Sequence, residues 1–160
     1  IRNPQGMAMN PWSDALWLNE HGPRGGDEIN IPEKGKNYGW PMATHGINYS
    51  GLKIPEAKGE HVEGTEKPLF VWKVSPAVSG MAFYNSDVFP QWKNKLFIGA
   101  LKEKDVIVLS VKGNTVTEDG RILGDKDHRI RDVRVGPDGY LYVLTDETDG
   151  QLWKVSPSGS

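Results

Sequence analysis

The sequence predicts an all-β fold made of β-propeller blades. Its 160 residues include 19 glycines and 11 prolines, and 37% of them are hydrophobic, which is typical of a globular, turn-rich chain. A strand–turn–strand unit recurs along the chain, and its plainest copy turns at Pro137-Asp138-Gly139. Proline presets its own φ and glycine accepts a positive φ, so this tripeptide favours a hairpin. Repetition of a unit that cannot bury both faces alone predicts stacked blades.

The predicted blades lie near residues 1–20, 69–117 and 129–156. The first contains Gly6-Met7-Ala8-Met9, and the second contains the similar run Gly80-Met81-Ala82-Phe83. A further hairpin is predicted in the second blade, with its turn at Lys112-Gly113-Asn114. In the third blade, apolar residues before and after the Pro-Asp-Gly turn predict two paired strands.

A long segment, residues 20–68, separates the first blade from the second and has no helical periodicity. We predict that it is a functional loop, because long loops in compact domains usually carry function or are disordered. Its first part, residues 20–30, is predicted to be loop throughout. Glycines there can turn carbonyls inward, and Asp27 and Glu28 add anionic oxygens, which together suit a hard cation such as calcium. Composition alone favours the alternative, an ordinary surface loop with solvated acids.

Charge and composition exclude several classes of partner. The net charge of -2 and the absence of a basic cluster give no electrostatic footprint for nucleic acid. No apolar run is long enough for a membrane span, so no membrane partner is expected. The chain has no cysteine, which excludes disulfides and thiolate metal sites. Residues 158–160 are predicted to be a linker or tag remnant.

Five motifs, in order along the chain, resemble the soluble quinoprotein glucose dehydrogenase family, and within it the aldose sugar dehydrogenases that depend on pyrroloquinoline quinone (PQQ). They are Arg2-Asn3-Pro4-Gln5-Gly6, then Glu20-His21-Gly22-Pro23 with Asp27-Glu28-Ile29-Asn30, then Lys36-Asn37-Tyr38-Gly39-Trp40-Pro41, then Ala100-Leu101-Lys102, and last Arg129-Ile130-Arg131-Asp132. The resemblance implies a six-bladed propeller that holds PQQ and calcium in the periplasm. It also implies oxidation of an aldose at C1 to a lactone by hydride transfer to PQQ.

The same resemblance implies the site residues. The residues that would bind PQQ are Arg2, Asn3, Tyr49, Ala100, Lys102, Arg129 and Arg131. Those that would bind calcium are Gly22, Pro23, Glu28 and Tyr38, the tyrosine through its carbonyl because a neutral phenol is a poor calcium ligand. The basic side chains suit a cofactor with three carboxylates. Without the resemblance, Arg129 and Arg131 would be interpreted as solvated strand residues beside Asp132, and Lys102 as one charge in a solvated turn.

The chain also departs from the family pattern. The family's catalytic histidine lies in an earlier blade and has no counterpart here, so we assign no catalytic residue and leave open whether the chain is an enzyme. Ile1 stands where the family usually has histidine. About three blades of six suggest the C-terminal half of a propeller, whose open faces a second copy, as a homodimer, or a partner carrying the missing blades would have to cover. The alternative function is a truncated or engineered fragment that self-assembles without turnover.

Overall fold

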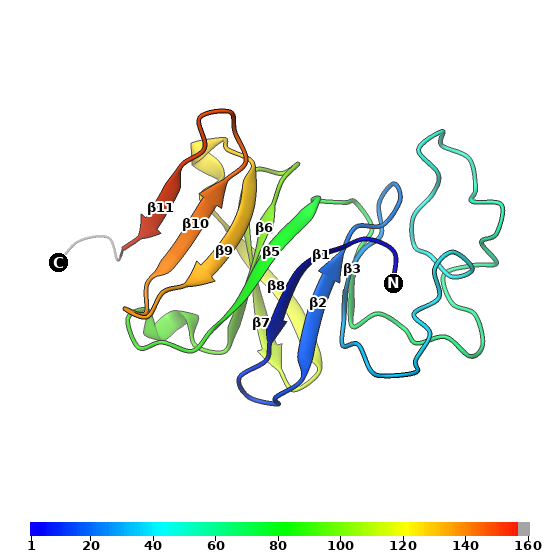
Figure 1. Ribbon diagram of the computed structural model, residues 1–160, viewed down its shortest axis with the longest axis horizontal. Coiled ribbons are helices and arrows are strands. Elements are labelled where there is room, and N and C mark those ends of the chain that lie inside the picture. Colours follow the sequence, from blue (N-terminus) through cyan, green and yellow to red (C-terminus); the bar gives the residue numbers. More distant parts are fainter. Residues whose placement is uncertain (157–160) are drawn as a thin grey trace.

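The computed structural model describes residues 1–156, which form three antiparallel sheets (Figure 1). Within that range there is no α-helix, and the only helical turns are two short 3-10 segments, η1 (Pro90–Trp92) and η2 (Gly124–Lys126). The sheets stand side by side as blades of a partial β-propeller. The predicted fold class is therefore confirmed, and the predicted linker at 158–160 lies outside the described residues.

The first sheet has the strand order β1-β2-β3-β4. These strands are β1 (Pro4–Met9), β2 (Leu16–Glu20), β3 (Asp27–Asn30) and β4 (Phe70–Trp72). The prediction that residues 20–30 are loop throughout is wrong, because Asp27–Asn30 pairs with β2 on one side and β4 on the other. Pairing with β4, which lies far away in the sequence, satisfies backbone groups that no local pattern could assign.

The other two sheets follow along the chain. The second contains β5 (Val78–Tyr84), β6 (Lys95–Ala100), β7 (Val106–Lys112) and β8 (Thr115–Ile122), and the third contains β9 (Ile130–Val135), β10 (Leu141–Thr145) and β11 (Leu152–Val155). The hairpin between β7 and β8 turns at Gly113-Asn114, since Lys112 pairs with Thr115. Pro137-Asp138-Gly139 joins β9 to β10, and Gly139 has the positive φ of +78° that the turn requires.

The second sheet lies between the other two, and its strands β5, β6 and β7 contribute buried side chains to a core on each face (Figure 1). Every residue of β5 is buried. Along β6, Leu96 and Ile98 pack toward the first sheet, whereas Phe97 packs toward the third. Because successive side chains of a strand point to opposite faces, this apolar run fills two cores at once.

The three inner strands, β1, β5 and β9, approach one another closely where the sequence has glycine. A Cβ atom at Gly6 would lie 2.5 Å from the Ser79 carbonyl oxygen of β5. A Cβ atom at Gly80 would lie 1.8 Å from Asp132 Oδ1 and 2.8 Å from the Asp132 Cα of β9. The repeated glycine of the Gly-Met-Ala runs is thus a requirement of packing between neighbouring blades.

The segment between β3 and β4 contains turns, bends and isolated bridges only. It folds back on the first sheet through a bridge between Arg24 and Ile47 and through the Leu69 N–H, which donates to the Ile29 carbonyl (2.8 Å). In Figure 1 it forms the lobe beside the first sheet, away from the third. Among residues 1–156, no helix is long and apolar enough to cross a membrane.

Replacing Gly80 with alanine should destabilise the chain by about 1–3 kcal/mol, because the new methyl group would collide with the backbone of β9. Gly120→Ala is the matched control, since a Cβ atom at Gly120 meets nothing within 4 Å and should change stability by less than about 0.5 kcal/mol. Urea unfolding monitored by tryptophan fluorescence measures both. Equal unfolding midpoints for the two variants would contradict the packing described for the inner strands.

Candidate functional site

The residues predicted to form the site lie at one end of the three sheets. Asn19, near the end of β2, donates from its side-chain amide to the Ser79 carbonyl at the start of β5 (2.9 Å). Ser79 Oγ in turn donates to the Ile130 carbonyl at the start of β9 (2.7 Å). These bonds align the starts of β5 and β9 with the end of β2. The turns after β2, β6 and β10 therefore converge at this end.

An open pocket of about 590 Å³ lies at this end. Four predicted site residues line it: Gly22, Pro23, Tyr49 and Lys102. Gly22-Pro23, Tyr49 and Lys102 are far apart in the sequence, and the structure brings them together. The pocket also has apolar lining from Ile47 and Val74, both of which are exposed. Its lining is therefore partly apolar and partly basic.

The loop from Gly22 to Gly26 is shaped by glycine. A Cβ atom at Gly22 would lie 2.0 Å from the Gly25 carbonyl oxygen, so no other residue fits there. Gly25 and Gly26 have φ values of +80° and +73°, which other residues rarely adopt. A Cβ atom at Gly46 would also meet Gly25 and Pro23, so the long segment packs directly against this loop.

The Asp27 side chain links the loop from Gly22 to Gly26 to the start of β5 and to the segment before it. Its side chain is fully buried and accepts hydrogen bonds from the Gly22 N–H (3.1 Å), from Ser75 Oγ (2.7 Å) and from the Val78 N–H (3.1 Å). A buried carboxylate is stable when it receives several hydrogen bonds. Asp27 is therefore an anchor between the first and second sheets, and it is not exposed to the pocket as a cation ligand.

A second, narrower pocket lies beside the same loop and contains Glu28 and Tyr38, the pair predicted to hold calcium. The pKa of Glu28 is raised from 4.5 to about 7, mainly by burial and also by the neighbouring Glu20 carboxylate, against a hydrogen bond from Asn30 that acts to lower it. The Tyr38 hydroxyl donates to the Ile31 carbonyl (2.6 Å) and accepts from the Glu33 N–H (2.9 Å), so it is used in local structure. A cation beside Glu28 would favour its ionised form.

The geometry limits how calcium could bind. In residues 1–156, no group of three or more His, Cys, Asp or Glu side chains is arranged to hold a metal ion. Backbone carbonyls would have to supply most of the ligands, as predicted for Gly22 and Pro23. The Gly22 carbonyl accepts a hydrogen bond from Arg2 Nη1 (3.0 Å). The half-buried Glu28 carboxylate, whose only hydrogen-bond partner among these residues is Asn30, fits a cation best.

Arg129 and Arg131 converge on one carboxylate, Asp146. Arg129 donates to Asp146 Oδ2 from Nε (3.1 Å) and Nη2 (2.9 Å), and Arg131 donates to Oδ1 from Nε (3.2 Å). Hydrogen bonds from Arg129, and then from Arg131, hold the pKa of the Asp146 carboxyl below its ordinary value. Both arginines lie on the same side of the strand end, as the alternation predicts, and two positive charges share one negative charge there.

The remaining predicted residues differ in accessibility. Tyr49 is 70% exposed, whereas Ala100 is fully buried and its N–H donates to the Asp105 carbonyl (2.9 Å). Lys102 is exposed, with Nζ 3.5 Å from the Ser75 carbonyl and 3.8 Å from Glu103. The Asn3 side chain accepts a bond from Gln5 (3.0 Å). Their roles toward a cofactor stay predictions.

Sequence reasoning missed two basic residues of the open pocket, Arg24 and Lys73. Neither forms an ion pair with any residue in the range 1–156. Arg24 directly follows Gly22-Pro23, and Lys73 follows β4 shortly before Ser75-Pro76. The signal that could have found them is this adjacency to motifs already singled out.

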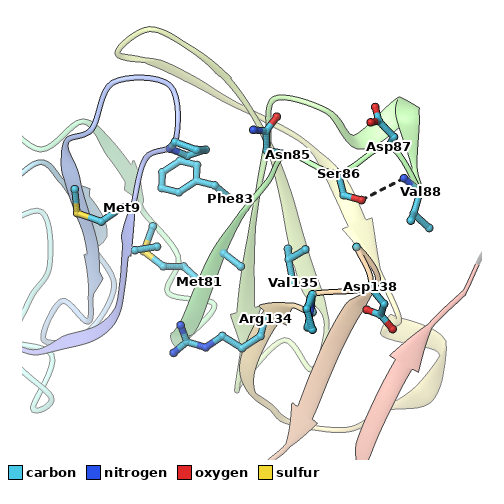
Figure 2. A pocket seen from close by; sticks show the side chains of 16 residues that line it. Met9, Met81, Phe83, Asn85, Ser86, Asp87, Val88, Arg134, Val135 and Asp138 are labelled. Atoms are coloured by element: carbon cyan, nitrogen blue, oxygen red, sulfur yellow. Dashed lines mark hydrogen bonds between the residues drawn. The ribbon is translucent and has the colours of Figure 1, made fainter.

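A larger pocket, of about 690 Å³, lies at the opposite end of the inner strands and contains none of the predicted site residues. Figure 2 shows Met9, Met81 and Phe83 on one side of it and Asp87 and Asp138 on the other. Its contents do not match the chemistry predicted from the motifs. The candidate site is therefore the open pocket at the other end, where the turns after β2, β6 and β10 converge; we call this the loop end.

Comparison with known proteins supports the motif analysis. The family model for glucose/sorbosone dehydrogenases matches residues 1–154. The chain is 82% identical over 157 residues to the aldose sugar dehydrogenase YliI of Escherichia coli, which covers 98% of this chain and 42% of that protein. It is 28% identical to quinoprotein glucose dehydrogenase B of Acinetobacter calcoaceticus, covering 96% of this chain and 43% of that protein.

Solved structures agree. The crystal structure of the soluble aldose sugar dehydrogenase from E. coli, in the apo form, superposes with a TM-score of 0.96 and covers 98% of this chain and 45% of its own. The PQQ-bound aldose sugar dehydrogenase from Streptomyces coelicolor shares the fold, with a TM-score of 0.70 at 24% identity, and covers 96% of this chain and 42% of its own. The chain thus spans less than half the length of these relatives.

The raised pKa of Glu28 predicts a pH-dependent stability in the presence of EDTA. The folded chain binds the Glu28 proton more tightly than the unfolded chain, so the free energy of unfolding should fall as the pH rises from about 4.5 through about 7. Glu28→Gln should remove this part of the decrease, whereas Glu56→Gln, at an exposed position, should leave it. Urea unfolding at several pH values tests this. Parallel pH profiles for the wild-type chain and Glu28→Gln would contradict it.

Proposed function

The chain belongs to the glucose/sorbosone dehydrogenase family, and on that premise we propose that it forms the quinone- and calcium-binding part of a periplasmic, PQQ-dependent aldose sugar dehydrogenase. The observation that carries the proposal is the open pocket, which brings Gly22, Pro23, Tyr49 and Lys102 together. The quinoprotein relative from Acinetobacter and the PQQ-bound structure from Streptomyces support PQQ as the cofactor.

The charges of the site fit an anionic cofactor. Lys102 lies in the pocket, as do Arg24 and Lys73, and Arg129 and Arg131 begin a neighbouring inner strand at the same end. Guanidinium and ammonium groups stabilise carboxylates and the negative charge that develops on a quinone during reduction. When bound, PQQ accepts a hydride from C1 of the aldose.

The apolar lining has a separate task. Ile47 and Val74 flank the pocket, and the exposed ring of Tyr49 offers a face on which a planar cofactor can pack. Packing of this kind excludes water from the reacting groups and strengthens the electrostatic interactions within the site. Tyr49 would therefore orient the ring system of bound PQQ, and the basic residues would hold its carboxylates.

Calcium is assigned to the loop side of the site. The Gly22 and Pro23 carbonyls would bind it beside the quinone, and Glu28 with the Tyr38 carbonyl would bind a second ion. The support is the Glu28 carboxylate, whose pKa burial raises to about 7 and whose only side-chain hydrogen-bond partner among residues 1–156 is Asn30. A bound calcium ion would stabilise its ionised form.

The proposed unit needs further blades for turnover. Relatives are more than twice as long, and the first and third sheets carry exposed apolar residues. Met7 and Met9 of β1 are 53% and 56% exposed, and Leu144 and Leu152 of the third sheet are 42% and 69% exposed. We assign these surfaces to contacts with a second copy or with a chain that carries the remaining blades.

PQQ binding in the presence of calcium tests the cofactor proposal. Titration of PQQ into the chain should quench its tryptophan fluorescence, and Lys102→Ala should weaken binding roughly tenfold, because a charge-assisted contact is lost. Lys112→Ala is the control, since Lys112 is exposed at the other end of the sheet. With an aldose and a dye acceptor added, we expect no sugar-dependent dye reduction by this chain alone.

Two results would count against this account. Absence of PQQ binding at micromolar concentrations would remove the cofactor from the proposal. Robust dye reduction would show that the chain needs no further blades.

Assembly through the exposed apolar faces is tested by light scattering. The purified chain should be a dimer at micromolar concentration, and Leu152→Asp should shift it toward monomer by placing a charge on the covered face. Leu52→Asp changes an equally exposed leucine in the long segment, away from the sheet faces, and should leave the dimer intact. A stable wild-type monomer would contradict homodimer closure.

A further inference from the structure

Arg2 is bound to its own chain at both its backbone and its side chain. Nη1 donates to the His21 carbonyl (3.1 Å) and to the Gly22 carbonyl (3.0 Å). The Arg2 N–H donates to the buried carboxylate of Glu20, which also receives the Asn3 N–H (3.1 Å). The start of β1 and the end of β2 are thereby joined to the loop that follows β2.

The Arg2 guanidinium also contacts the ring of Trp40. The Arg2 guanidinium carbon lies 5.1 Å from the centre of the Trp40 ring, which is within the range of a cation–π interaction. Trp40 belongs to the long segment between β3 and β4, and it lines the narrow pocket together with Arg2, Gly22 and Glu28. Arg2 is thus held between the long segment and the Gly22 loop.

We propose that Arg2 and Trp40 are positioning residues: Arg2 holds the His21 and Gly22 carbonyls in their orientation, and Trp40 holds the Arg2 guanidinium. The functional part of this inference rests on the proposed function, because the Gly22 loop is assigned there to cofactor and calcium binding. The resemblance to the family implies a different role for Arg2, direct contact with PQQ. In the structure both Nη1 hydrogen bonds end on backbone carbonyls.

The loop needs such support because of its composition. Gly22, Gly25 and Gly26 give it more conformational freedom than any other residues would. Asp27 accepts from the Gly22 N–H, but an ionised carboxylate has no proton to donate to the carbonyls. Arg2 supplies the hydrogen bonds to the His21 and Gly22 carbonyls. Its guanidinium is planar and donates in fixed directions, whereas a lysine ammonium could bind the two oxygens only in a less defined geometry.

Hydrogen exchange of the cofactor-free chain tests the positioning role directly. The reporter amides are those of His21, Gly22 and Gly26, which donate within the structure to Asn3 O, Asp27 Oδ1 and Trp72 O. Arg2→Ala and Trp40→Leu should each speed their exchange about tenfold, since charged hydrogen bonds are lost or loosened. The conservative variants Arg2→Lys and Trp40→Phe should restore part of the protection.

Arg24→Ala is the matched control. Arg24 is a basic residue of the same loop, its side chain is exposed, and it should leave the exchange of the three reporter amides unchanged. Unfolding midpoints measured for all variants separate a local effect from global destabilisation. If Arg2→Ala and Arg2→Lys both leave exchange at the reporter amides unchanged, the positioning role is wrong.

PQQ titration with calcium separates positioning from direct contact. If Trp40 acts through Arg2, the double variant Arg2→Ala/Trp40→Leu should bind PQQ no more weakly than Arg2→Ala alone, because coupled residues are not additive. Weaker binding by Arg2→Ala with unchanged exchange, together with normal binding by Trp40→Leu, would assign Arg2 to direct contact and overturn the inference. If the wild-type chain binds no PQQ, the proposed function fails, and hydrogen exchange still decides the positioning role.

Discussion

The close approach of the inner strands is the constraint on which the rest of the structure depends. Gly6 allows β1 to pack against β5, and Gly80 allows β5 to pack against β9, because any side chain there would overlap the neighbouring backbone. Asn19 and Ser79 then fix the relative height of the strands through hydrogen bonds to backbone carbonyls. As a result, loops from three sheets meet at one end, and residues far apart in the sequence share a pocket.

At that end of the sheets two acidic side chains are buried, whereas basic side chains line the open pocket. Asp27 and Glu20 are buried and receive backbone N–H groups, so they set the shape of the Gly22 loop without facing the open pocket. Lys102, Arg24 and Lys73 line the open pocket, and among residues 1–156 neither Arg24 nor Lys73 forms an ion pair. A negatively charged, planar ligand in the open pocket would meet the basic side chains, and a cation in the narrow pocket would meet the Glu28 carboxylate. This separation is what the proposed quinone and calcium sites require.

Local chemistry made part of the structure predictable. The Pro137-Asp138-Gly139 hairpin and the Gly113 turn follow from the backbone preferences of proline and glycine, which act over a few residues. The recurrence of Gly-Met-Ala indicated repeated blades, although only the structure gives its physical reason. The family resemblance also implied Tyr49 and Lys102 as site residues, and both line one pocket in the structure.

Other features depend on contacts that no local pattern encodes. Asp27–Asn30 becomes a strand because β4, on the far side of a long segment, pairs with it. Trp40 reaches Arg2 by the same return of the chain, and Arg24 and Lys73 line one pocket because β4 pairs with β3. The sequence around Trp40 and Lys73 does not mark them as site residues, since an exposed lysine or a loop tryptophan usually serves solvation or packing.

The central claim is that the loop end of the three sheets binds the quinone. Amide chemical shifts of the ¹⁵N-labelled chain, recorded as PQQ and calcium are added, test it most directly. We expect the chemical-shift changes to be concentrated in residues 20–26, 47–51, 73–77 and 100–105. Changes confined to residues 85–88 and 134–139, at the opposite pocket, would contradict it.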